Sequence, residues 1–472
     1  MAKHPDEITR LVLKAAEEAR NQEDAAHEPA LTQPIEWPVQ CTVGPGLEGA
    51  IACESKVGYV NGSKGRLIYR GYDIFDLCAY SNFEEVCYLL LHGELPTAPL
   101  LDVFSKKLVN YRRLPETLRR LMSFPVERMK PMAALRLGVN LMRQEFTSRD
   151  LETGGIDVGS TIGSDEDSIP METLPRGAKR ATYEFRAGKP RRQDRTGKAL
   201  QDAAGLEACC HLIAGVATLA AAISRVHKGY MPIDPDPHLS HAANFLYMIT
   251  GARPDPAKER VMDISLILHA DHGMNASMFA AMVVASTLAD IYFSVGAGIS
   301  ALSGPLHGGA NEQVMLTLEE IGSPKAVKAW YKKARARNRK IMGFGHRVYK
   351  TYDPRARVLG PLAKHVAKGA ALVQIAESLE REVVEDLGAK KQIYPNVDFY
   401  SGVVYGAMGI SPELFTPTFA VSRVSGWTAR VLEYLENNRI FRPRAVYVGP
   451  LDREYIPVDR RVTRTSSGRR IR

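Results

Sequence analysis

Cysteine is scarce in this sequence, with six among 472 residues. No two of them form a Cys-x-x-Cys pair, and the neighbours Cys209 and Cys210 are not expected to bridge each other. This composition excludes a disulfide scaffold and fits a reducing compartment, so we expect a cytoplasmic location.

Long apolar runs are also missing. No uncharged apolar run reaches the roughly 18 residues that a membrane-spanning helix needs. The hydrophobic stretches 275–289 and 291–306 stop at a charge or at a Gly-rich polar site, which predicts helices buried in a large protein. The N-terminal region has early acids and no apolar h-region, so we expect no secretory signal, no transit peptide and no membrane contact.

Basic residues exceed acidic ones only slightly, 62 against 53, which gives a formal net charge of +9. The segment 149–198 nets +1, whereas 459–472 holds six Arg and one Asp and nets +5. A further segment, 325–340, carries eight bases and no acid. Such runs are usually solvated faces or tails, and the competing interpretation is an anion-binding site.

Strand signals are few. Glycines and β-branched residues over 44–73 predict one short hairpin that turns near Asn61 and Gly62. Elsewhere the apolar residues follow helical periodicity, so the predicted fold class is all-α. The segment 146–200 is low in large apolar residues and predicts a disordered insertion. Helices are predicted over 5–20, 83–91, 100–111, 115–123, 131–142, 242–250, 274–290, 311–320, 361–387 and 418–437, and from 206 onward.

Four polar clusters place a His or an Asp at an element boundary, among Gly or aromatic residues. A lone His or Asp is usually structural, but repetition of one local design favours function, because loops on a helical scaffold often hold active groups. Asp398 precedes Phe399 and Tyr400, which predicts partial desolvation, a raised pKa and use as a base. The clusters are 268–273, 303–311, 343–355 and 394–400.

A basic set accompanies these clusters. Arg355, Arg423 and Arg442 lie near turns or in apolar company, and the guanidinium fork of Arg matches carboxylates. This set fits a small dianionic or trianionic substrate, although Arg442, beside the basic tail, could equally be a surface Arg paired with a Glu. The bases over 325–340 precede a Gly-Phe-Gly loop, where a large anion such as a nucleotide-bearing cofactor could bind.

Taken together, these motifs resemble the citrate synthase family. The segments 343–355, 303–311 and 395–402 resemble its catalytic segments, and 65–73 and 91–97 resemble its N-terminal ones. The resemblance extends over 46–450, apart from the insertion. It implies a homodimer, with a higher oligomer possible. The implied parts are a helical arm and linker (1–40), a large domain (41–312 and 413–450), a small domain that closes over the substrates (313–412) and a basic tail (451–472).

The resemblance also implies an acyltransferase of the tricarboxylic acid cycle, which condenses acetyl-CoA with oxaloacetate and hydrolyses the citryl thioester. Asp398 would be the base, His307 the donor to the enol oxygen and His346 the donor to the ketone. No metal and no permanently bound cofactor are implied. His272, His346, Arg355, Arg423 and Arg442 would bind oxaloacetate, Arg442 from the partner subunit, and Gly343, Phe344, Gly345 and Lys350 would bind coenzyme A.

Three alternatives remain at the level of sequence. A 2-methylcitrate synthase would use propionyl-CoA with the same motifs. A metal-dependent phosphohydrolase would use His269, Asp271, His272 and Asp398 as ligands. A nucleic-acid-binding helical protein would use the basic segments 325–340 and 459–472, but it leaves the His and Asp clusters unexplained, so we expect no nucleic acid.

Overall fold

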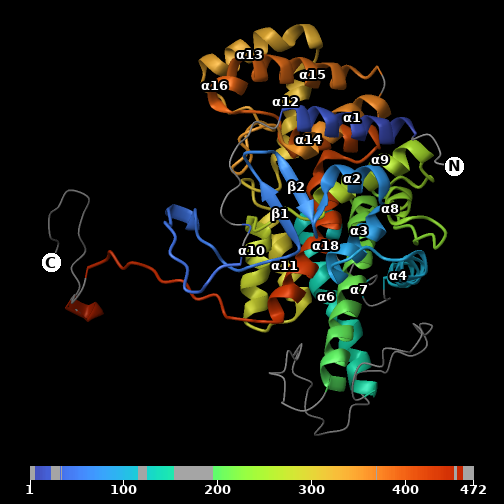
Figure 1. The fold of residues 1–472 in the computed structure, drawn as a ribbon, viewed down its shortest axis with the longest axis vertical. Helices are drawn as coiled ribbons and strands as arrows, with labels where there is room; N and C mark the ends of the chain where they lie inside the picture. The colour runs from blue at the N-terminus through green and yellow to red at the C-terminus, as the bar shows by residue number, and fades with distance from the viewer. Residues whose placement is uncertain are drawn as a thin grey trace. The chain divides into compact units, whose positions relative to one another are not determined.

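The fold is almost entirely helical, as the periodicity predicts, and Figure 1 shows its arrangement. The chain through Arg439 clusters into one compact unit, and residues from Ile440 onward form a second. The division into a large and a small domain stays a prediction. The computed structural model describes residues 6–22, 32, 34–114, 118, 125–153, 195–367, 369–450, 454–455 and 457–460.

The N-terminal part combines one helix with the predicted hairpin. Helix α1 (Glu7–Asn21) begins at Asp6, whose carboxylate accepts a hydrogen bond from the Thr9 N–H. The antiparallel strands β1 (Gly58–Asn61) and β2 (Arg66–Tyr69) pair with Asn61 opposite Arg66, so the turn lies where Asn61-Gly62 predicts it. The remaining elements here are β3 (Tyr72–Asp73), α2 (Ile74–Tyr80), α3 (Phe83–His92) and α4 (Ala98–Asn110).

The core is built around α18 (Phe415–Leu435), which packs against α7, α9, α10 and α11. The Trp427 side chain of α18 is fully buried, and most of this helix is buried on every side. The helices around it are α6 (Pro131–Thr153), α7 (Arg195–His227), α8 (His241–Thr250), α9 (Pro256–His269), α10 (Ala276–Ser286) and α11 (Ile291–Leu302).

Helix α7 is the one described helix long and apolar enough to cross a membrane, over Gly205–His227, and 94% of its most apolar window is buried in the protein. Such burial is what the central helix of a helical core requires. Helices α6 and α7 extend into the predicted 146–200 insertion, to Thr153 and from Arg195; residues 154–194 lie outside the described residues.

A second group of helices lies at the upper end of the view in Figure 1, with α13, α15 and α16 outermost and α12 and α14 beneath them. Within this group α14 packs on α17, and α12 packs on both α15 and α17. The members are α12 (Ala310–Ile321), α13 (Val327–Ala336), α14 (Pro354–Val366), α15 (Ala371–Val383), α16 (Ala389–Lys391) and α17 (Val397–Ala407).

One helix prediction is wrong, and another lies almost wholly outside the described residues. The single helix predicted over 361–387 is wrong: α14 ends at Val366, Gly369 adopts a left-handed φ of 77°, and α15 begins at Ala371. The start is also earlier, because Pro354 occupies the first turn of α14, where a missing N–H costs nothing. The helix predicted over 115–123 falls almost wholly outside the described residues.

Candidate active site

His307 lies in the loop between α11 and α12. Its Nε2 accepts a hydrogen bond from the Ser277 backbone N–H at 3.3 Å and lies 2.8 Å from the Ser277 hydroxyl. A backbone N–H always donates, so Nε2 is an acceptor and the imidazole proton lies on Nδ1. Burial and then the Arg423 charge lower the pKa of His307 to about 4. At pH 7 only about one His307 ring in a thousand is charged.

His346 has the opposite tautomer. Its Nδ1 accepts hydrogen bonds from the backbone N–H groups of Val348 at 2.9 Å and Tyr349 at 3.1 Å, so its proton lies on Nε2. Burial lowers the pKa of His346 to about 4, and the charges of Arg355 and Lys350 act in the same direction. The site therefore holds two neutral imidazoles, each with one N–H that has no acceptor among the residues described.

The loop that holds His346 is fastened to the start of α17. The Gly345 N–H donates to the Tyr394 carbonyl and the Asn396 N–H to the Gly343 carbonyl, both at 2.9 Å. The Phe344 and Phe399 rings lie 4.5 Å apart between the two segments. Segments about fifty residues apart in the chain therefore lie against each other, which brings the 343–355 motif to the 394–400 motif.

Asp398 occupies the first turn of α17 and is half-buried. Burial raises the pKa of its carboxyl to about 7, although the charges of Arg355 and Arg423 oppose the rise. Among the described residues, no group donates a hydrogen bond to this carboxylate. The desolvation predicted from its aromatic neighbours is present, and the carboxyl titrates where a base acts at neutral pH.

Arg355, in the first turn of α14, forms a bidentate ion pair with Asp353 inside the protein. Its Nε lies 3.0 Å from one Asp353 oxygen and its Nη2 2.8 Å from the other, and both side chains are almost fully buried. Burial alone would raise the pKa of Asp353, but the Arg355 charge and hydrogen bonds hold it below its ordinary value. Asp353 also accepts the Val397 N–H at 3.3 Å, directly before Asp398.

Arg423 reaches the same region from α18. Its Nε donates to the His269 carbonyl at 2.6 Å, and its buried Nη2 has no hydrogen-bond partner in the part of the chain that the structure describes. Burial lowers the pKa of Arg423 to about 10, so the guanidinium still carries its charge at pH 7. A buried cation with an unused donor is suited to bind an anion.

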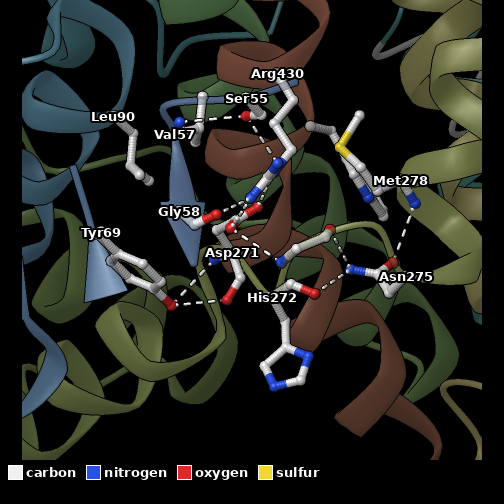
Figure 2. A network of polar contacts seen from close by, with 12 residues as sticks. Ser55, Val57, Gly58, Tyr69, Leu90, Asp271, His272, Asn275, Met278 and Arg430 are labelled. Carbon is white, nitrogen blue, oxygen red and sulfur yellow. Dashed lines mark hydrogen bonds and ion pairs between the residues drawn. The ribbon is translucent and has the colours of Figure 1, made fainter. Parts of the chain in front are cut away.

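His272 follows α9 and is buried. Its Nε2 lies 3.2 Å from the Tyr349 hydroxyl, and its ring lies 5.2 Å from the His346 ring. Burial and then the Arg355 charge lower the pKa of His272 well below its ordinary value. Figure 2 shows that its ring points away from the Arg430 side chain, which holds the preceding residue, Asp271.

Lys350, Arg442 and the basic segment 325–340 have contacts other than those with the histidines and Asp398. The Lys350 N–H donates to the Gly62 carbonyl in the hairpin turn, and a Cβ on Gly62 would lie 2.2 Å from the Val348 carbonyl oxygen. Arg442 belongs to the second unit, where its side chain is exposed and bonds the Pro443 carbonyl at 3.3 Å. In the 325–340 run, Arg335 pairs with Asp386 and Arg339 with Glu320.

The residues offered as metal ligands have other partners. Both Asp271 oxygens accept hydrogen bonds from Arg430, and His269 Nδ1 lies 2.6 Å from the Ser265 carbonyl oxygen. Across the described ranges, no three His, Cys, Asp or Glu side chains group as metal ligands. The chemistry of the site is that of neutral imidazoles, a titratable carboxyl and buried guanidinium groups.

Sequence reasoning missed four residues of the site: Ser277, Tyr349, Asp353 and Arg430. Tyr349 and Asp353 lie inside the 343–355 motif, and this location was the signal that could have identified them. Ser277 and Arg430 act through contacts across 30 and 159 residues of chain, respectively, and no local pattern signals them.

Comparison with known proteins adds independent information. The family described as "Citrate synthase, C-terminal domain" matches residues 46–444. A citrate synthase of Acidithiobacillus ferridurans is 40% identical over 88% of this chain and 98% of its own length. A citrate synthase of Deinococcus radiodurans is also 40% identical over 88% of this chain and 98% of its own.

Solved structures agree. Citrate synthase from Pyrobaculum aerophilum superimposes with a TM-score of 0.74 at 38% identity, covering 91% of this chain and 100% of that one. Citrate synthase from Thermoplasma acidophilum, in a ternary complex with carboxymethyl coenzyme A and oxaloacetate, gives 0.75 at 29% identity, covering 89% and 100%. The chain therefore belongs to the citrate synthase family.

Proposed function

We propose that the chain condenses the methyl group of acetyl-CoA with the ketone of oxaloacetate and then hydrolyses the citryl thioester, releasing citrate and coenzyme A. The observation that carries this proposal is the pair of neutral His donors of opposite tautomer, combined with a carboxyl whose pKa is about 7. The ternary complex of the Thermoplasma acidophilum relative, which holds oxaloacetate and a coenzyme A derivative, supports the two substrates.

Asp398 is the base in this proposal. A thioester methyl is a very weak acid, so its deprotonation needs a positioned base and a donor at the carbonyl oxygen where charge develops. The Asp398 carboxylate takes the methyl proton, while the His307 Nδ1–H stabilises the enol oxygen. A neutral His suits this task, since it donates a hydrogen bond without adding a buried charge.

His346 acts on the second substrate. Its Nε2–H polarises the oxaloacetate ketone, and the enol carbon attacks the ketone carbon to form the new bond. The alkoxide that results takes the Nε2 proton of His346 and becomes the hydroxyl of the citryl thioester, and the proton that Asp398 removed from the methyl group restores the neutral imidazole and the carboxylate. Water then attacks the thioester carbonyl, and coenzyme A leaves as the thiol.

Arg355, Arg423 and His272 hold the oxaloacetate carboxylates in this proposal. Arg442 of the partner subunit completes the clamp in a homodimer, which agrees with its exposure here and its place in a separate unit. Gly343, Phe344, Gly345 and Lys350 contact coenzyme A. Closure of the 313–412 segment over both substrates would exclude water until the carbon–carbon bond has formed.

The test is thiol release from acetyl-CoA and from propionyl-CoA, each with and without oxaloacetate. We expect oxaloacetate-dependent release that is faster with acetyl-CoA. Faster release from propionyl-CoA would contradict the acetyl assignment in favour of 2-methylcitrate synthesis. Absence of release from either thioester would overturn the proposed function.

A further inference from the structure

Outside the reacting centre, α18 and the loop after α9 are joined by a buried ion pair. Arg430 of α18 donates from Nε to one Asp271 oxygen at 2.7 Å and from Nη2 to the other at 2.8 Å. The two side chains are 4% and 1% exposed, so water does not screen the pair. This is the geometry in which removing one partner is costly, because the other is left charged and buried.

The Asp271 backbone is held as firmly as its side chain. Its carbonyl accepts a hydrogen bond from the Tyr69 hydroxyl at 2.8 Å, and its N–H donates to the Tyr69 hydroxyl oxygen at 3.1 Å. The Gly273 N–H donates to the Asp271 carboxylate at 3.1 Å. His272 lies between Asp271 and Gly273, and these hydrogen bonds restrict the backbone on both sides of it.

The ion pair also reaches the N-terminal hairpin and the backbone of α18. Arg430 donates from Nη1 to the Ser55 hydroxyl at 2.9 Å and from Nη2 to the Gly58 carbonyl at 3.0 Å. A Cβ on Gly426 would lie 2.2 Å from the Ala270 carbonyl oxygen, so the helix backbone itself abuts the loop. Three parts of the fold therefore meet at Asp271, next to His272.

We propose that Asp271 and Arg430 are positioning residues, which set the His272 ring against Tyr349 and His346 and thereby determine oxaloacetate affinity. The inference rests on the proposed function, because it takes His272 as part of the oxaloacetate site. Neither Asp271 nor Arg430 touches substrate in this proposal. They act through the backbone of the loop, and their effect is confined to the substrate that His272 binds.

The first measurement is the Asp271→Asn variant, which keeps the shape of the side chain and removes its charge. We expect the oxaloacetate KM to rise about tenfold, the value that the loss of one charged hydrogen bond gives. The acetyl-CoA KM and kcat are expected to stay within about twofold. A change in kcat with the oxaloacetate KM unmoved would contradict the proposal.

The deciding measurement is a double-mutant cycle with His272→Ala. If Asp271 acts through His272, then Asp271→Asn adds little to the oxaloacetate KM once the imidazole is gone. Effects that add in full would overturn the positioning role. An unchanged oxaloacetate KM in His272→Ala alone would instead overturn the assignment of His272, so the two failures are distinguishable.

A matched control lies on α9 itself. Arg260 and Asp263 form an ion pair at 2.8 Å, and Arg260 also bonds the carbonyls of Cys78 and Ser81, away from the His272 loop. Asp263→Asn is expected to leave the oxaloacetate KM within twofold. If Asp271→Asn does not fold, Arg430→Lys is the second variant, because it keeps the positive charge but loses the two-pronged guanidinium contact. The double-mutant cycle with His272→Ala and the thermal unfolding midpoint are then measured with Arg430→Lys.

Discussion

Asp353 and Asp398 stand at the starts of neighbouring helices, α14 and α17, and are linked by the Val397 N–H, which donates to Asp353. Both carboxyls lose water, yet their pKa values move in opposite directions. The Arg355 fork holds the pKa of Asp353 below its ordinary value, whereas burial raises that of Asp398 to about 7.

The difference is a matter of partners. Both Asp353 carboxylate oxygens accept hydrogen bonds, from the Arg355 guanidinium and from backbone N–H groups, so Asp353 is a fixed anion that orients Arg355. Asp398 has no donor to its carboxylate among the described residues, so desolvation dominates. The neighbours of the two aspartates thus make Asp353 a structural anion and give Asp398 a pKa that suits the proposed base.

The largest expected effect comes from Asp398→Asn, which removes the proposed base and keeps the shape of the side chain. Turnover should fall by roughly 10³-fold, the usual contribution of a general base. Oxaloacetate binding, measured by equilibrium titration, should change less than about twofold, because the proposed role of Asp398 is to deprotonate acetyl-CoA. Retention of most turnover would refute the assignment of the base.

Asp353→Asn removes the charge of the other aspartate of the pair. Arg355 would be left as a buried cation without its carboxylate, so we expect a loss of about 3 kcal/mol in unfolding free energy and a rise of roughly 30-fold in the oxaloacetate KM. Denaturant unfolding and initial rates measure the two effects. The partly exposed pair Arg335–Asp386 supplies the control, since Asp386→Asn should change neither quantity measurably.

The pH dependence tests the pKa of Asp398 directly. With a pKa of about 7, the ionised fraction rises about tenfold between pH 6 and pH 8, so kcat/KM for acetyl-CoA should rise by the same factor. His307 and His346, with pKa values of about 4, stay neutral throughout this window and do not produce the rise. A flat profile from pH 6 to pH 8 would contradict the raised pKa.

The same shift has a consequence for stability. Because folding raises the pKa of Asp398, the folded state binds the proton more tightly than the unfolded state does. This contribution to stability is present in full below the unfolded pKa of about 4 and is lost as the pH rises through 7. The stability of Asp398→Asn relative to the parent should therefore increase from pH 4 to pH 7, as measured by thermal unfolding.

The smallest expected effect concerns Tyr349, which lies near Asp353 and contacts His272. Tyr349→Phe removes the hydroxyl that lies 3.2 Å from His272 Nε2. We expect the oxaloacetate KM to rise about threefold, the value of one neutral hydrogen bond. The matched change Tyr331→Phe, at a hydroxyl that bonds Asp386, should leave kinetics unaltered, and an equal effect of both would contradict a specific role for Tyr349.

Much of the local structure was predictable. The hairpin turn at Asn61 and Gly62, the helix at 83–91 and the helix at 418–437 follow from periodicity and turn residues, which are properties of short segments. The break between α14 and α15 was missed, because the periodic apolar residues continue across it and one Gly is a weak signal.

The features of the site likewise divide into those set by local sequence and those set by tertiary contacts. The order of residues by itself determined which groups are present: His272, His307 and His346 at loop boundaries, Asp398 among aromatics, and Arg355 and Arg423 as cations. Tertiary structure alone decided what each of them is chemically. Ser277 selects the His307 tautomer from 30 residues away, and Arg430 fastens the His272 loop from 159 residues beyond Asp271. Tautomer and pKa depend on burial and on the nearest donor, and both are set by contacts between segments far apart in the chain.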